Sequence, residues 1–136
     1  MTNQQTLQPE NLSPTLMAAL TRLTKGAASL SPVDCLKQAK DHLQRAASLA
    51  ASKPTVNMAL AKAIIEACEQ VVADFDSLPP HSKAWLKGAM LYFAQTEDGE
   101  HDFDSFLGFD DDCEVLNACL ELAGRDDLLL NPEDYD

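Results

Sequence analysis

Nine carboxylates lie between Glu97 and Glu114, and this stretch of the chain contains no lysine or arginine. They are Glu97, Asp98, Glu100, Asp102, Asp104, Asp110, Asp111, Asp112 and Glu114. Carboxylates bind hard cations, attract basic partners and, when paired, act in general acid–base catalysis. This acidic stretch could therefore serve cation binding, binding of a basic partner or catalysis, besides a purely structural role.

Apolar side chains are interspersed with these acids: Phe103, Phe106, Leu107 and Phe109. A solvated acidic tail has no use for so much apolar surface, because exposed aromatic rings lose the favourable free energy of burial. The pattern predicts an ordered acidic loop that is anchored to a core by its phenyl rings.

A hard-cation site is one hypothesis, with four candidate ligands: Asp98, Asp102, Asp111 and Asp112. Two like charges ~6 Å apart repel by ~0.7 kcal/mol in water and by ~2.8 kcal/mol at an effective dielectric constant of ~20. Bound Ca²⁺ or Mg²⁺ would offset that repulsion. The spacing does not match an EF-hand, because with Asp98 first Phe103 takes the place of the glycine and Phe109 that of the bidentate glutamate.

A structural role needs no ligand. Asp110, Asp111 and Asp112 stand where a helix is predicted to begin, so they would cap free N–H groups and interact with the positive end of the helix dipole. Asp102 would accept hydrogen bonds from backbone N–H groups, and Gly108 would supply a position of positive φ. In this interpretation the acids fix a helix–loop–helix corner.

Catalysis is the least supported of these chemistries. His101 lies between Glu100 and Asp102, where it is more typical of an exposed loop imidazole than of a proton shuttle. The five glycines do not form a phosphate-binding motif. We therefore expect a protein that is not an enzyme.

The 136-residue chain has a net charge of −12, which is unevenly distributed. Residues 1–96 carry nine bases and seven acids, a sum of +2, whereas residues 97–136 carry fifteen acids and Arg125, a sum of −14. The second part would repel nucleic acid and anionic membranes and attract a basic protein partner. The sequence predicts an acidic binding face, with no nucleic-acid or membrane partner.

The composition also predicts a cytoplasmic location. The polar start, residues 1–11, lacks the pattern of a signal peptide, and the longest strongly apolar run, residues 88–94, is too short to span a bilayer. The four cysteines form no C-x-x-C pair and lie among apolar residues of predicted helices, so we expect reduced core thiols. No cofactor is expected, apart from Ca²⁺ or Mg²⁺ in the metal hypothesis.

Helical periodicity predicts an all-α, single-domain bundle of about five helices, with the acidic loop between the last two. The predicted helices cover residues 14–25, 32–51, 55–77, 81–95 and 111–123, the fourth being the most buried. The predicted domain covers residues 13–130, after a flexible N-terminus over 1–12 and before a frayed acidic tail over 131–136.

Several side chains have predicted positions in this bundle. Asp111 and Glu114 form a capping-box pattern for the fifth helix, and Glu114, Asn117 and Glu121 are expected to share its wet face. Arg125 is expected to pair with Asp102 or Asp111. Lys83 and Lys87 are either counter-ions of the acidic loop or solvated lysines, and His42 is placed on a helix surface.

A family motif runs through the acidic loop. Its residues are Tyr92-Phe93, Asp98, Asp102-Phe103, Gly108-Phe109 and Asp111-Asp112. The motif resembles the core of the YkvA-like bacterial family, a domain of unknown function, and the resemblance covers roughly residues 84–124. His101 and Ser105 stand where family members usually have proline. The resemblance implies a helical domain with no established activity.

Together these observations predict a cytoplasmic, non-catalytic helical domain that binds another macromolecule through an acidic face. The alternative is a Ca²⁺- or Mg²⁺-binding domain that uses the loop carboxylates, with or without a metal-dependent activity. The sequence does not choose between a loop that binds a cation and one that is purely structural.

Overall fold

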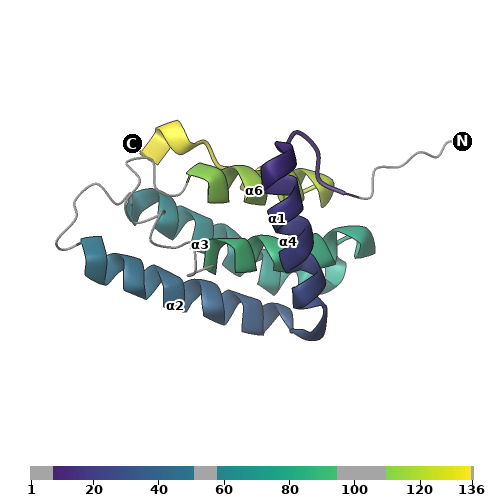
Figure 1. The fold of residues 1–136 in the computed structure, drawn as a ribbon, viewed down its shortest axis with the longest axis horizontal. Helices are drawn as coiled ribbons and strands as arrows, with labels where there is room; N and C mark the ends of the chain where they lie inside the picture. The colour runs from purple at the N-terminus through teal and green to yellow at the C-terminus, as the bar shows by residue number, and fades with distance from the viewer. Residues whose placement is uncertain (1–7, 51–57, 95–109, 136) are drawn as a thin grey trace, which may run out of the picture.

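The computed structural model describes residues 8–50, 58–94 and 110–135, which form an all-α bundle without a strand in these ranges (Figure 1). The α-helices of these ranges are α1 (Pro14–Gly26), α2 (Pro32–Ala50), α3 (Met58–Ala73), α4 (Pro80–Ala94) and α6 (Asp110–Leu122). The short 3₁₀ turns are η1 (Ala27–Ser29), η2 (Phe75–Ser77), η3 (Asp126–Leu128) and η4 (Pro132–Tyr135). The predicted all-α bundle is confirmed.

The first two helices begin where the Ser-Pro pairs predict. The Oγ of Ser13 accepts a hydrogen bond of 3.2 Å from the backbone N–H of Leu16, and the Oγ of Ser31 accepts one of 3.1 Å from that of Asp34. Proline takes the first helical position in both, where its missing N–H costs no hydrogen bond. Local capping chemistry thus sets the start of α1 and α2.

The predicted third helix is too long at its C-terminal end. Helix α3 ends at Ala73, and Asp74 has φ −105° and ψ 14°, outside the helical region. The chain then makes the separate turn η2, which is followed by Pro79 and Pro80. Proline is not tolerated in the interior of a helix, because it lacks the backbone N–H and clashes with the preceding turn. The start predicted at residue 55 lies outside the described residues.

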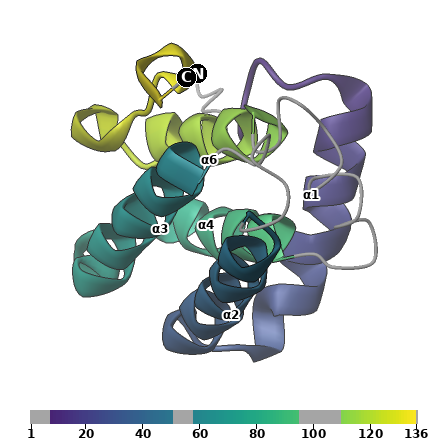
Figure 2. The same cartoon turned by 90° about the vertical axis from the view of Figure 1, so that its left-hand side faces the viewer.

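Helix α4 lies at the centre of the bundle, where it contacts α1, α2 and α6 (Figures 1 and 2). Its side chains supply much of the core, and the largest fully buried residues of the bundle include Leu20, Leu60, Ile64, Leu86, Met90, Phe93 and Leu120. Helix α3 packs against α2 and α6. Helix α4 is thus central in its contacts, but the prediction that it is the most buried helix is wrong, because α3 has eight buried residues and α4 has seven.

Helices α1 and α4 approach each other closely at Gly88. A Cβ added to this glycine would collide with Oγ1 of Thr24 and would lie 3.0 Å from the Cα of Thr24. Only a residue without a side chain fits there, so Gly88 sets the spacing of the two helices.

The buried stripe of α2 includes a histidine. The side chains with no exposed area in this helix are Cys35, Ala39, His42 and Ala46. His42 is therefore a core residue and not the surface residue that the sequence predicts. Its ring packs edge-on against Phe93 of α4, with 5.2 Å between ring centroids. Burial, and then the charge of Arg45, lowers the pKa of His42 to about 4.

Two lysines of α4 also have specific contacts. The Nζ of Lys87 donates a hydrogen bond of 2.8 Å to the carbonyl of Leu30, in the connection before α2. The Nζ of Lys83 lies 5.6 Å from the centroid of the Phe75 ring, a cation–π distance. Lys87 is therefore a tether between helices and not a solvated lysine, while any contact of either lysine with the acidic loop lies outside the described residues.

All four cysteines are buried and free, as the sequence predicts. Within the described ranges, no helix has both the length and the apolar character needed to cross a bilayer.

Candidate binding groove on helix α6

The structure describes two members of the predicted acidic motif. Asp98, Asp102, Phe103, Gly108 and Phe109 lie outside the described residues, so their predicted roles stay predictions. Asp111 and Asp112 are described and lie in the first turn of α6. A carboxylate there is stabilised by the N-terminal end of the helix dipole.

The predicted N-cap at Asp111 is wrong by two residues, because a helix capped by Asp111 would begin at residue 112. Helix α6 begins at Asp110, so Asp111 is already helical and cannot act as the cap that precedes the first helical residue. Glu114 is exposed on the same helix. The acids thus belong to the first turns of α6.

Asp111 and Asp112 face different environments. Asp111 is exposed, whereas Asp112 is only 3 % exposed. The pKa of the Cys68 thiol on α3 is raised to about 12, first by burial and then by the charges of Glu69 and Asp112. Asp112 therefore lies on the buried side of α6, whereas Asp111 faces water.

This divergence bears on the metal hypothesis. Of the four candidate ligands, Asp98 and Asp102 are outside the described residues, and Asp111 and Asp112 differ in exposure. Among residues 8–50, 58–94 and 110–135, no group of three or more His, Cys, Asp or Glu side chains is placed to hold a metal ion. The cation site stays a prediction.

Asn117 holds the C-terminal segment against α6. Its Nδ2 donates a hydrogen bond of 2.7 Å to the carbonyl of Leu130, and its Oδ1 accepts one of 2.9 Å from the Leu130 N–H. The Cys113 thiol, one turn earlier, lies 3.8 Å from the same carbonyl. Asn117 was predicted to face water; it is in fact partly buried beneath this segment.

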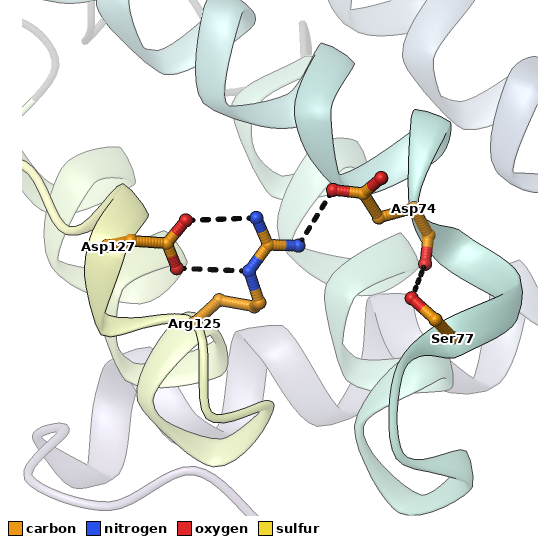
Figure 3. Close-up of polar contacts among 4 residues, drawn as sticks. All are labelled: Asp74, Ser77, Arg125 and Asp127. Atoms are coloured by element: carbon orange, nitrogen blue, oxygen red, sulfur yellow. Dashed lines mark hydrogen bonds and ion pairs between the residues drawn. The ribbon is translucent and has the colours of Figure 1, made fainter.

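Arg125 fixes the start of the same segment (Figure 3). Its Nε and one terminal nitrogen donate hydrogen bonds of 3.0 Å to the two carboxylate oxygens of Asp127, and the other terminal nitrogen donates one of 3.0 Å to Asp74, after α3. These bonds raise the pKa of Arg125 and lower that of Asp127.

The predicted pairing of Arg125 with Asp111 is therefore wrong. The two residues belong to opposite ends of α6, which is 13 residues long and so spans about 20 Å. The other predicted partner, Asp102, lies outside the described residues. The partner that the sequence analysis does not name, Asp127, follows Arg125 by only two positions.

The C-terminal segment is more regular than the frayed tail that the sequence predicts. The Oδ1 of Asn131 accepts a hydrogen bond of 3.1 Å from the Glu133 N–H, and η4 follows from Pro132 to Tyr135. Leu128 and Leu130 pack against the core, while Leu129 between them is exposed. The segment thus docks through alternate leucines.

A groove of about 410 Å³ opens beside this docked segment. It is lined by Glu10, Asn11, Cys113, Glu114, Asn117, Ala118, Glu121 and Pro132. Its walls come from three parts of the chain: the segment before α1, one face of α6, and the start of η4. Among the lining residues that the structure describes, three are carboxylates and none is a lysine or arginine.

The N-terminal wall was not predicted, because residues 1–12 were expected to be flexible. Pro9 is buried, Leu12 packs against the core, and Asn11 has φ 69°, a left-handed conformation that asparagine tolerates. These residues direct the chain past α6 before α1 begins.

Comparisons of the chain with family models, curated proteins and solved structures found no match.

The groove has the chemistry of a cation-binding surface of ordinary ligand-site size. Carboxylates at its wall attract positive charge, and the partly exposed Pro132 offers contact area for aliphatic groups. Helical spacing could have located the α6 face, since Cys113, Asn117 and Glu121 follow one another at intervals of four.

Proposed function

We propose that this protein is a cytoplasmic, non-catalytic helical domain that binds a basic macromolecular partner, most simply a protein, through an acidic face. This face consists of α6 and the C-terminal segment that follows it, residues 110–135. The chief support for the proposal is that Arg125, the one basic residue of this face, is already hydrogen-bonded to carboxylates of this chain.

Residues 110–135 carry nine carboxylates and a single base, Arg125. The guanidinium of Arg125 is hydrogen-bonded to Asp127 and Asp74, so its charge is balanced by carboxylates of this chain. The exposed acids of the face include Asp111, Glu114, Glu121, Asp126, Glu133 and Asp134. A surface with this charge distribution accelerates encounters with a positively charged partner and repels anionic ones.

We include kinship with the YkvA-like family in the proposal. Its support is the motif quoted above, of which Tyr92-Phe93 lies near the end of α4 and Asp111-Asp112 in the first turn of α6. A helix thus stands on each side of the acidic stretch, as the resemblance implies.

The proposal is tested by affinity capture with the full chain immobilised at low salt. We expect one or a few basic proteins that elute as the salt concentration is raised, because rim charges are screened by salt. The control is a variant in which three exposed acids near the C-terminal end of the face, none of them bonded to Arg125, are neutralised: Asp126→Asn, Glu133→Gln and Asp134→Asn. Recovery of no basic protein, or equal recovery by this variant, would contradict an acidic binding face.

A further inference from the structure

The groove beside the C-terminal segment is the most specific feature of the acidic face. We propose that it is the docking site for a basic, extended segment of the partner, with the docked C-terminal segment of this chain forming one wall. This inference rests on the proposed function and narrows it to one place on the face.

The shape of the groove supports a peptide-like occupant. Its volume of about 410 Å³ accommodates a few side chains, and Glu114 and Glu121 lie on one face of α6, two helical turns apart. The two glutamates are seven positions apart, and at a rise of 1.5 Å per residue their Cα atoms are about 10 Å apart. Glu10 contributes a third carboxylate from the segment before α1.

The spacing of the carboxylates selects the occupant. In an extended polyproline-type segment, residues three apart point to the same side and are about 9 Å apart. Two arginines at this spacing would each reach one carboxylate of α6. Their aliphatic stems would lie against Pro132, which is partly exposed in the wall of the groove.

The wall formed by the C-terminal segment makes the site conditional on docking. Asn117 lines the groove and also makes both hydrogen bonds to the backbone of Leu130. Pro132, two residues later, lines the same groove. Breaking the Asn117 contact would therefore remove a wall without removing any carboxylate.

The test measures binding of a fluorescent peptide to the full chain by anisotropy at low salt. The peptide carries two arginines separated by two residues, in a proline-rich background, and its partner probe has glutamine in place of both arginines. The variants are E114Q/E121Q and N117A. The matched control is D41N/E66Q, which removes two carboxylates from exposed positions on α2 and α3 that do not line the groove.

We expect E114Q/E121Q to weaken binding of the arginine peptide by about tenfold, the sum of two rim contacts, and D41N/E66Q to change it by less than about twofold. N117A is expected to weaken it by about fivefold although the net charge is unchanged. Circular dichroism and melting of each variant establish that it is folded.

Three results would overturn the inference. Equal weakening by E114Q/E121Q and D41N/E66Q would mean that the peptide responds only to net charge, which leaves the acidic-face proposal standing without the groove. Equal binding of the glutamine peptide would remove the role of the arginines. Absence of peptide binding, together with capture of a basic protein in the preceding experiment, would place the partner elsewhere on the acidic face.

Discussion

The side-chain amide of Asn117 forms two hydrogen bonds with the backbone of Leu130, one to its carbonyl and one from its N–H. A side chain here replaces the neighbouring strand that normally pairs with an extended backbone. Because both polar groups of Leu130 are partnered, its side chain can pack against the core without leaving them unsatisfied. These two hydrogen bonds hold the acidic C-terminal segment against α6.

Replacing Asn117 by alanine should release this segment. The Leu130 N–H loses its side-chain partner and the Leu130 carbonyl keeps only the weak contact with the Cys113 thiol, so the expected loss is about 1–3 kcal/mol in the free energy of unfolding, measured by urea denaturation. Hydrogen exchange at the Leu130 amide should become faster. Asn131→Ala, which removes an exposed hydrogen bond to Glu133, is the control, with an expected loss below about 0.5 kcal/mol. An equal effect of the two substitutions would contradict the role of Asn117.

Much of the fold could be predicted because it depends on local chemistry. The Ser-Pro pairs at residues 13 and 31 specify helix starts through caps that involve only neighbouring residues. The central place of α4 follows from apolar residues on nearly all sides of the helix. The early end of α3 at Ala73 was missed because the apolar pattern continues through Phe75 and Leu78, in the turn beyond it.

The site could be predicted only in part, because its contacts join residues distant in sequence. Asn117 and Arg125 both look like surface residues in the sequence, and their roles depend on Leu130 and Asp74. Periodicity could have identified His42, which follows Cys35 at helical spacing, but its polarity argued for the surface. Long-range pairing of polar groups leaves no signature in a single sequence.

Replacing Gly88 by alanine should destabilise the protein, although the same change usually stabilises a helix by about 1 kcal/mol. The new Cβ would collide with Thr24 of α1, and forcing the helices apart costs about 1–3 kcal/mol. Gly26→Ala is the matched control, because no atom lies within 4 Å of the added Cβ at that position. Thermal melting should show a lower Tm for Gly88→Ala and an equal or higher Tm for Gly26→Ala. A stabilised Gly88→Ala variant would contradict the close approach.

Arg125→Ala should cost about 1 kcal/mol in the free energy of unfolding, because a bidentate pair with a third hydrogen bond exceeds an ordinary surface pair. The side chain is 22 % exposed, and that of Asp74 is 43 % exposed, so water and salt reduce the effect. The difference between the wild type and the variant, measured by urea denaturation, should shrink as salt is added. A change below about 0.3 kcal/mol at low salt would show that Arg125 is only a surface charge.

Protonation of His42 should destabilise the fold at acid pH. The pKa of His42 is lowered from 6.5 to about 4, because burial between α2 and α4 disfavours the charged ring. The unfolded chain therefore binds a proton at a higher pH than the folded chain does. Stability due to this residue is fully present above pH ~6.5 and is lost as the pH falls toward ~4, by roughly 3 kcal/mol in total.

The measurement is the difference in the free energy of unfolding between the wild type and His42→Leu at several pH values from 7 to 4. Substitution changes the packing against Phe93 at every pH, so the constant part of the difference reports packing and the pH-dependent part reports the proton. Carboxylates titrate in both proteins, and their contribution cancels in this difference. His81→Gln, at an exposed position, should retain the pH dependence of the wild type. If the His42→Leu variant loses stability below pH 6 as steeply as the wild type, the buried neutral imidazole is not what makes the fold sensitive to acid.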